Sequence, residues 1–153
     1  MHIHIADLQN PVQQQAIVDL LEMYSQHEFG SGKPLPADVR ARLIPGLQAQ
    51  PGQLIFLAWD ETHPIGLAIC FLGFSSFKAK PLINVHDLAV APAYRGQGVG
   101  RALLTAIDDE ARRRDCCRVT LEVRSDNLQA QHLYRRLGYS GSEPETWFWM
   151  RTF

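Results

Sequence analysis

The segment Arg95-Gly96-Gln97-Gly98-Val99-Gly100 carries the strongest chemical signal in the chain. Its glycines alternate, and residues without a side chain let the backbone approach a ligand closely and adopt unusual dihedral angles. An apolar run at 82–90 predicts a strand before the segment, and the apolar spacing from 99 to 107 predicts a helix after it. The first turn of a helix leaves about four N–H groups unpaired and carries partial positive charge. The segment therefore predicts an anion site suited to phosphate.

The charges around this segment favour the same interpretation. No Asp or Glu occurs from residue 91 to residue 107, although acidic residues usually occupy the first turn of a helix. Two cations, Arg95 and Arg101, flank the glycines instead. Other phosphate motifs are absent, because no Gly-Lys is followed by Ser or Thr and the GxGxxG spacing places Arg101 after Gly98. The alternative is that the glycines only turn the chain. That alternative does not explain why acidic residues are absent here or why two arginines flank the glycines.

The elements that must position this segment follow from periodicity and from turn residues. Strands are predicted at 2–5, 54–59, 65–74, 82–90, 119–123 and 147–153. Helices are predicted to begin at Pro11, to cover 37–48, to follow the glycines, and to run over 127–137 before Gly138. Strands and helices in this order predict a mixed α/β domain built on one sheet, with residues 1–153 forming a single domain.

Composition narrows the class of protein. Hydrophobic residues make up 46% of the chain and charged residues 20%, which is typical of a globular protein and excludes a disordered chain. The net charge of −1 argues against binding to nucleic acid. No apolar run is long enough to span a membrane, and no secretory signal is visible. The odd count of three cysteines argues against a disulfide framework and a zinc site, so we expect no metal and a cytoplasmic location.

Through two sequence motifs, the chain resembles the GNAT superfamily of N-acetyltransferases. The acetyl-CoA signature of that family is Arg/Gln-x-x-Gly-x-Gly/Ala between a strand and a helix, as at Arg95–Gly100 after Asp87-Leu88-Ala89-Val90. A second family block, Asn-x-x-Ala-x-x-Leu-Tyr-x-x-x-Gly-Phe, matches Asn127 to Tyr139, with Tyr139 in place of Phe. The resemblance covers about residues 82–140. It implies a twisted mixed sheet of about seven strands with about four helices, and acetyl transfer from acetyl-CoA to a primary amine.

The resemblance also implies roles for particular residues. It pairs the pantetheine arm of acetyl-CoA with backbone groups of Leu88, Ala89 and Val90, as if the arm were an added strand. It places the pyrophosphate on the amides of Arg95, Gly96, Gln97, Gly98, Val99, Gly100 and Arg101. Asn127 would contact the cofactor or cap the following helix, and Tyr134 would protonate the leaving thiolate or serve as a core aromatic. N–H groups near Ala89 and Val90 would stabilise an oxyanion.

The base that accepts the proton of the amine is where the chain departs from the family pattern. Many relatives carry Glu immediately before the Asp of the central strand, and this chain carries His86 there. Histidine serves as a base near neutral pH. Glu122 is the second candidate, and the third is that no single protein group acts as base. Because neighbouring residues of a regular strand face opposite ways, only one of His86 and Asp87 is expected to face the cleft, and Asp87 is interpreted as structural.

The acceptor side of the site is less defined. The resemblance makes Tyr24, His27, Glu28 and Phe74 walls of an acceptor pocket, although solvated loop residues explain the same sequence. A small-molecule amine is favoured as acceptor, and a protein N-terminus or lysine is the alternative. A non-catalytic acyl-CoA-binding module is the competing class, and a longer acyl chain is a third possibility. The aromatic tail that begins at Trp147 would suit either a contact in a homodimer or a buried last strand.

Overall fold

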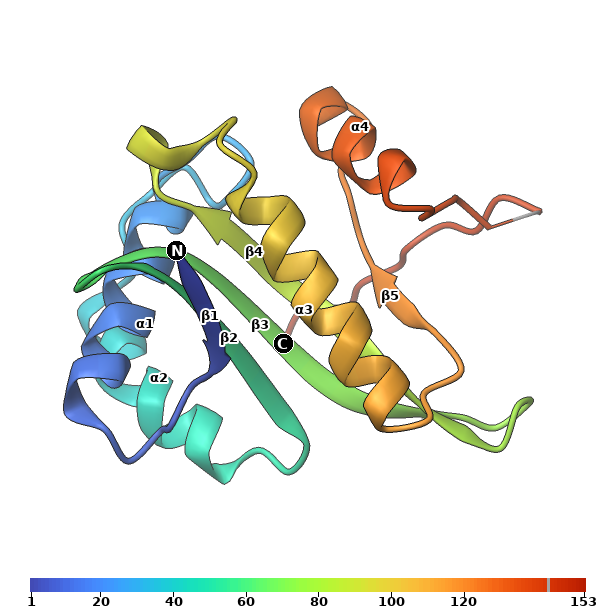
Figure 1. Cartoon of the computed structure of the whole chain (residues 1–153), viewed down its shortest axis with the longest axis horizontal. Helices are drawn as coiled ribbons and strands as arrows, with labels where there is room; N and C mark the ends of the chain where they lie inside the picture. The colour runs from blue at the N-terminus through green and yellow to red at the C-terminus, as the bar shows by residue number, and fades with distance from the viewer. Residues whose placement is uncertain (143) are drawn as a thin grey trace. The chain divides into compact units, whose positions relative to one another are not determined.

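The computed structural model describes residues 1–142 and 144–153 (Figure 1). Its strands are β1 (His2–Ile5), β2 (Gln53–Asp60), β3 (His63–Ser75), β4 (Lys80–Val90) and β5 (Val119–Leu121). Its helices are α1 (Pro11–Ser25), α2 (Ala37–Ala49), the 3-10 turn η1 (Pro92–Tyr94), α3 (Val99–Arg113) and α4 (Leu128–Arg136). The mixed α/β class and the order of the elements up to α4 agree with the sequence prediction.

The strands form one sheet in the order β1-β2-β3-β4-β5. Strands β1 to β4 are an antiparallel meander, and β5 is parallel to β4. The expectation of about seven strands is wrong in detail, because the described sheet has five. The strand predicted at 119–123 ends at Leu121, and the segment 147–153 is not a strand. Apolar aromatic residues favour strands, but without a paired neighbour a segment has no ladder to join.

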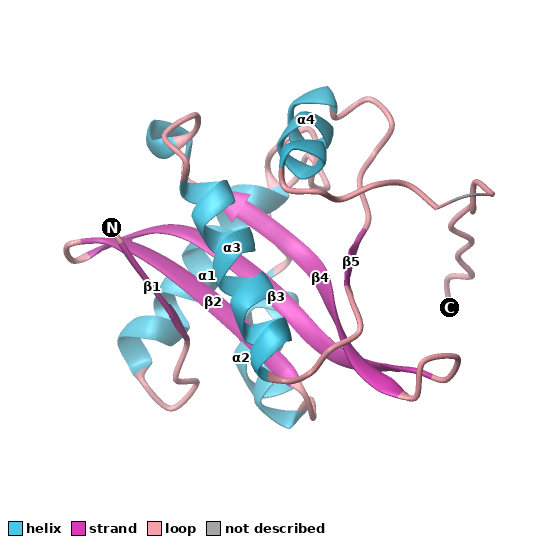
Figure 2. Cartoon of the chain, turned by 45° about the vertical axis from the view of Figure 1, so that its right-hand side comes forward, coloured by secondary structure: helices cyan, strands magenta, loops and turns pink. Residues whose placement is uncertain are grey.

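Helices cover both faces of the sheet (Figure 2). Helices α1 and α2 cover one face of the sheet. Their buried apolar residues form one core cluster with alternate residues of β2, β3 and β4, including Ile55, Leu67 and Ala89. The intervening residues face α3, as strand alternation requires. At Gly66 of β3 an added Cβ would lie 2.8 Å from Val99 Cγ1 and 3.0 Å from Leu103 Cδ1. Gly66 therefore lets the first turns of α3 approach the sheet closely.

The local sequence explains where two of the helices begin. Asn10 caps α1, because its side-chain oxygen accepts hydrogen bonds from Val12 N and Gln13 N, and Pro11 occupies the first helical position. Helix α3 has a strongly one-sided apolar face, with Leu103, Leu104 and Ile107 fully buried. Arginines follow in its last turn, where cations favour the helix dipole.

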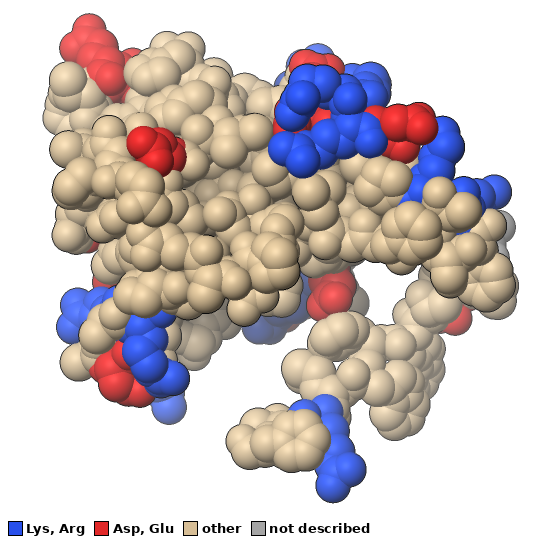
Figure 3. All heavy atoms as spheres, turned by 90° about the horizontal axis from the view of Figure 1, so that it is seen from below, with Lys and Arg blue, Asp and Glu red and all other residues tan. Residues whose placement is uncertain are grey.

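Charged side chains of both signs are intermixed on the surface drawn in Figure 3. At the end of α3, for example, Arg112 pairs with Asp109 at 2.7 Å and Arg113 pairs with Glu110 at 2.6 Å. The Arg112–Asp109 pair is exposed on both sides, and such pairs add little stability, whereas the Glu110 carboxyl is buried. Among the described residues, no helix has the length and apolar character that crossing a membrane requires.

The chain divides into two compact units, residues 1–122 and residues 123–153. The first unit holds the whole sheet with α1, α2 and α3, and the second holds α4 and the C-terminal segment. In the second unit the large apolar side chains of the tail are exposed, Trp147 by 74% and Trp149 by 82%. The buried last strand expected there is thus not present in the described chain.

Candidate functional site

The predicted glycine turn connects β4 to α3 through η1. Gly96 has φ 74° and Gly98 has φ 87°, both in the left-handed region that favours glycine. A Cβ at either position would meet no atom within 4 Å, so the requirement for glycine is conformational and the space around the turn is open. This part of the backbone is therefore accessible to a ligand.

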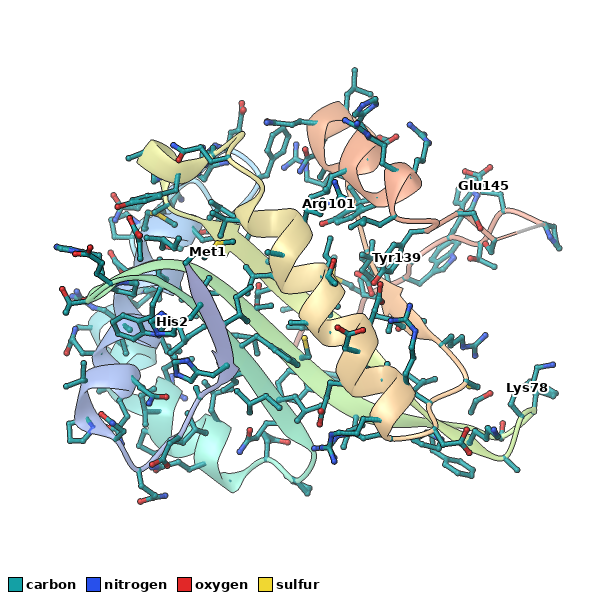
Figure 4. All side chains as sticks on the ribbon, in the orientation of Figure 1. Met1, His2, Lys78, Arg101, Tyr139 and Glu145 are labelled. Carbon is teal, nitrogen blue, oxygen red and sulfur yellow. The ribbon has the colours of Figure 1, made fainter. Side chains whose placement is uncertain are left out.

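The N-terminus of α3 lacks the side-chain cap that α1 and α4 have, as does that of α2. Gly98 occupies the cap position without a side-chain hydrogen bond, whereas Asn10 caps α1 and Asn127 caps α4. The first helical bond of α3 runs from Ala102 N to Gly98 O at 2.9 Å, so the N–H groups of the first helical turn have no partner within the helix. Two amides predicted to hold the pyrophosphate are already used, because Arg95 N donates to Pro92 O and Gln97 N donates to Tyr94 O. Arg101, labelled in Figure 4, lies in the first turn of α3. The turn thus offers backbone donors and a cation to an anion.

Strand β4 has an open edge just before this turn. Its ladder with β5 contains three residue pairs and ends at Val85 and Leu121, whereas β4 continues to Val90. On the other side Ala91 N donates to Ile65 O at 2.9 Å. The alternation of an antiparallel ladder then directs the N–H and C=O groups of Ala89 to β3 and those of Leu88 and Val90 to the open edge.

This alternation refines two expectations. Of the three residues predicted to pair with an added strand, Leu88 and Val90 present their backbone groups to the open edge. Of the two N–H groups predicted for an oxyanion, only that of Val90 lies on that side. Val90 O already accepts a hydrogen bond from Arg95 Nε at 3.1 Å, which agrees with an edge that no strand occupies.

A β-bulge changes the direction of the side chains in β4. Ile69 pairs with Asp87 and Cys70 pairs with Val85, so His86 is the extra residue. Asp87 shares the face of its partner Ile69, which belongs to the core cluster with α1. The His86 ring lies 5.8 Å from the ring of Phe71, which packs against the same cluster. His86 and Asp87 therefore share one face, and the expectation that only one of them faces it is wrong.

The two groups differ in their surroundings. His86 is exposed, whereas Asp87 is partly buried. Burial raises the pKa of the Asp87 carboxyl, and the neighbouring His86 opposes that rise. Among the described residues no hydrogen bond to the Asp87 carboxyl is found, so its interpretation as a satisfied structural acid finds no support. A partly buried carboxylate beside an imidazole suits an incoming cation.

Three of the predicted acceptor residues lie together, Tyr24 in the last turn of α1 and His27 and Glu28 in the loop that follows. His27 N donates to Tyr24 O at 3.0 Å, and the Tyr24 hydroxyl donates to Phe29 O at 3.3 Å. Glu28 lies exposed between them. Sequence reasoning missed that Arg95 Nη1 of the glycine turn donates to His27 Nε2 at 2.9 Å. The loop after α1 and the glycine turn, 68 residues apart in sequence, therefore meet.

The other two predicted residues of this unit lie elsewhere. Phe74 is 68% exposed and pairs with Pro81 near the tip of the β3–β4 hairpin. Five residues of strand, about 16 Å, separate that pair from His86, so the structure does not bring Phe74 to the glycine turn. Glu122 is exposed one residue beyond the end of β5, where the β4–β5 ladder has already ended.

The second unit holds Asn127 and Tyr134. Asn127 caps α4, accepting a hydrogen bond from Ala130 N at 3.1 Å. Gly138, at φ 88°, reverses the chain after α4, and Tyr139 N donates back to Tyr134 O at 3.0 Å. The rings of Tyr134 and Tyr139 lie 6.0 Å apart, and Tyr134 is half-buried. Among the described residues no group of three potential metal ligands gathers.

Two curated proteins with similar sequence are named as acetyltransferases. Streptothricin acetyltransferase of Streptomyces lavendulae is 41% identical over 58 residues, which is 38% of this chain and 31% of that protein. The [ribosomal protein bS18]-alanine N-acetyltransferase of Escherichia coli K12 is 44% identical over 57 residues, 37% of this chain and 38% of that protein. In these matches the chain spans about a third of the length of the curated relatives.

The fold also has a counterpart among solved structures. A crystal structure described as a probable acetyltransferase superposes with a TM-score of 0.86 at 24% identity, covering 100% of this chain and 99% of the other. The sequence profile described as "Acetyltransferase (GNAT) family" matches residues 17–139 and so includes parts of both units. The chain therefore belongs to the GNAT acetyltransferase family.

Proposed function

We propose that this protein transfers an acetyl group from acetyl-CoA to a primary amine, with residues 1–153 acting as one catalytic domain. The observation that carries the proposal is the left-handed glycine turn, which joins the open edge of β4 to the uncapped N-terminus of α3. An edge with unpaired backbone groups suits an extended amide-bearing chain, and an uncapped helix start suits a phosphate. The pantetheine arm and the pyrophosphate of CoA are neighbouring parts of one molecule with these two chemistries.

The residues present fit acetyl-CoA as the donor. Leu88 and Val90 would pair with its pantetheine arm, and the amides of Gly96 and of Gly98 to Arg101 would hold its pyrophosphate. The thioester supplies an acetyl group that an amine can attack directly. A covalent enzyme intermediate on Cys70 is disfavoured, because burial raises the pKa of that thiol to about 12 and keeps it protonated.

On the acceptor side, His86 is the proposed base, with Glu122 as the alternative. A primary amine arrives largely protonated, since its pKa is near ~10, and must lose a proton before it attacks. His86 is exposed at the bulge and would accept that proton directly or through a water. Asp87, on the same face, would attract the cationic amine. The N–H of Val90 would stabilise negative charge on the carbonyl oxygen, and Tyr134 would protonate the thiolate.

We favour a small-molecule amine as acceptor, because the Asp87 carboxyl and the His86 ring form a compact polar site for one cationic group. The family relative that acetylates streptothricin is named for a small molecule. The second candidate is a protein N-terminus, supported by the likeness to the ribosomal-protein alanine acetyltransferase. The cytoplasm as its location rests on the three free cysteines, which suit a reducing compartment.

The first test is a thiol-release assay with acetyl-CoA against a panel of amines and of N-terminal peptides. We expect turnover with one class of acceptor. Tyr134→Phe should lower kcat by about 10²–10³ without weakening acetyl-CoA binding, and His86→Gln should do so more strongly than Glu122→Gln. Binding of acetyl-CoA, measured by calorimetry, without turnover on any acceptor would instead favour the non-catalytic acyl-CoA-binding module.

A further inference from the structure

We propose that Arg95 is a positioning residue for the acceptor. Its side chain fastens the loop after α1, residues 26–36, to the end of β4 and does not bind the phosphates of the donor. The sequence alone suggests the other role, because Arg95 and Arg101 both flank the glycines. The inference rests on the proposed function, since it takes this loop as a wall of the acceptor pocket.

The Arg95 side chain folds back onto the end of β4. Its Nε donates to Val90 O at 3.1 Å, and its Nη1 donates to His27 Nε2 at 2.9 Å. Arginine has only donors, so both partners are acceptors. The planar fork of a guanidinium presents separate N–H groups in fixed directions, so it can hold both partners at once. One side chain therefore joins the end of β4 to a residue 68 positions earlier than Arg95.

This contact leaves the open edge of β4 usable by a ligand. A backbone carbonyl oxygen has two lone pairs, so Val90 O can accept from Arg95 and from a ligand amide together. The N–H of Val90 points to the same edge, and Arg95 cannot accept from it. The guanidinium would thus lie beside the donor arm and stay in place when the arm binds.

The far end of the loop is fixed to its own helix. Lys33 N donates to Ser25 O at 3.2 Å, and Leu35 N donates to Glu22 Oε2 at 3.0 Å. Both acceptors lie in the last turn of α1. The contact with the guanidinium adds a second attachment near the start of the loop, and this one reaches the end of β4.

The near end of the loop carries two residues of the predicted acceptor wall. His27 is held directly by Arg95, and Glu28 follows it in the chain. Arg95 would therefore hold this wall at a fixed place beside Val90, whose N–H is proposed to stabilise the reacting carbonyl. Loss of the Arg95 side chain should disturb acceptor binding. It should leave the phosphate site unchanged, because that site is proposed to use backbone amides and Arg101.

Hydrogen exchange read by mass spectrometry tests the attachment of the loop without any ligand. In Arg95→Met, which removes both donors, the amides of residues 26–35 should exchange about 3–10-fold faster, as the loss of one hydrogen bond or two predicts. Arg101→Met is the matched control, because the exposed Arg101 guanidinium makes no hydrogen bond to another described residue. It should leave exchange in the loop as in the wild type. Unchanged exchange in Arg95→Met would overturn the proposal.

Calorimetry with coenzyme A tests whether Arg95 serves the phosphates. Arg95→Met should bind coenzyme A within about threefold of the wild type, whereas Arg101→Met should bind it about tenfold more weakly. If Arg95 held the phosphates, Arg95→Met would weaken binding and Arg95→Lys, which keeps the charge, would restore it. That pattern would overturn the inference.

Kinetics with an acceptor that turns over should show the same division. Arg95→Met should raise the KM for the acceptor about tenfold and leave the KM for acetyl-CoA within about threefold, a split that a general loss of stability does not produce. A rise in the KM for acetyl-CoA alone would contradict the positioning role. A wild type that fails to bind coenzyme A would overturn the proposed function, whereas the exchange measurement would still decide whether Arg95 holds the loop.

Discussion

At the scale of single residues, Asp87 and His86 show how one extra residue changes a site. Without the bulge, the imidazole would lie on the opposite face of β4 from the carboxylate. With it, both groups lie on the face that α1 covers. The carboxylate is partly desolvated there, and a group with a raised pKa in such a position is a frequent mark of a functional site.

The burial of Asp87 predicts how stability depends on pH. Its pKa is raised on folding, so between the unfolded and folded pKa values the folded state binds more protons, and stability falls as pH rises. Asp87→Asn cannot ionise and escapes this loss. We expect the variant to gain stability relative to the wild type as pH rises above about 4, until the folded pKa is passed. Urea unfolding at a series of pH values measures the difference.

Asp19→Asn is the control for this prediction, because it removes one negative charge from the exposed side of α1. A stability difference between Asp87→Asn and wild type that stays constant over the whole pH series would contradict the linkage argument.

At the scale of elements, the glycine turn lowers the stability of the start of α3 and leaves its backbone accessible to a ligand. Side-chain caps stabilise α1 and α4, and the same position in α3 carries none. The N–H groups that a cap would satisfy stay open to a ligand instead. The first turn of α3 lacks the stabilisation of a cap, and its close packing at Gly66 holds it against the sheet.

Gly98→Ala tests this turn. An L-residue in the left-handed region costs about 1–2 kcal/mol, so the free energy of unfolding should fall by roughly that amount. Acetyl-CoA should also bind more weakly, since the new methyl group projects from the turn into open space. Urea unfolding and calorimetry measure the two effects.

Gly46→Ala is the matched substitution. Gly46 lies inside α2 with no atom within 4 Å of an added Cβ, so alanine should stabilise the protein by about 0.5–1 kcal/mol and leave acetyl-CoA binding unchanged. The interpretation of the turn fails if Gly98→Ala is as stabilising as Gly46→Ala.

At the scale of the whole molecule, the sheet protects one cysteine and the tail exposes a group of aromatics. Cys70 is fully buried in β3, whereas Cys116 and Cys117 are only half-buried. The Trp147 and Trp149 rings stack with centroids 6.5 Å apart while remaining largely exposed. We therefore expect Cys70 to be protected from reagents in solution and the tail aromatics to be accessible to them.

Cys70 should report the unfolding of the sheet. In a Cys116→Ser/Cys117→Ser variant, a thiol reagent should label Cys70 only as fast as the protein opens, because the thiol is buried and its pKa is raised to about 12. Labelling rates should therefore rise in urea with the unfolded fraction. Fast labelling in native buffer would contradict both the burial and the exclusion of Cys70 from the proposed reaction.

The tail should mediate self-association. An exposed aromatic cluster is typical of protein contacts, so we expect a homodimer that Trp147→Ser/Phe148→Ser/Trp149→Ser converts to monomer. Sedimentation velocity over a range of concentrations measures the oligomeric state. Phe77→Ser is the control, since Phe77 is 98% exposed on the β3–β4 connection. A wild type that stays monomeric at high concentration would contradict this prediction.

Much of the fold follows from the sequence alone. The glycine turn, the helix after it, the Asn127 cap and the order of the elements up to α4 follow from residues close together in sequence. Turns, caps and amphipathic helices depend on local backbone preferences and on spacing, and both are properties of a single segment. The family block around the glycines is local for the same reason.

Features that depend on two distant segments required the fold. The bulge at His86 arises in the register between β3 and β4, and neither strand carries it alone. The contact between Arg95 and His27 joins residues 68 positions apart. The aromatic tail has the composition of a strand and forms none, because a strand exists only through a paired neighbour. Pairing and register are long-range choices, and they decided which of the chemically capable side chains meet.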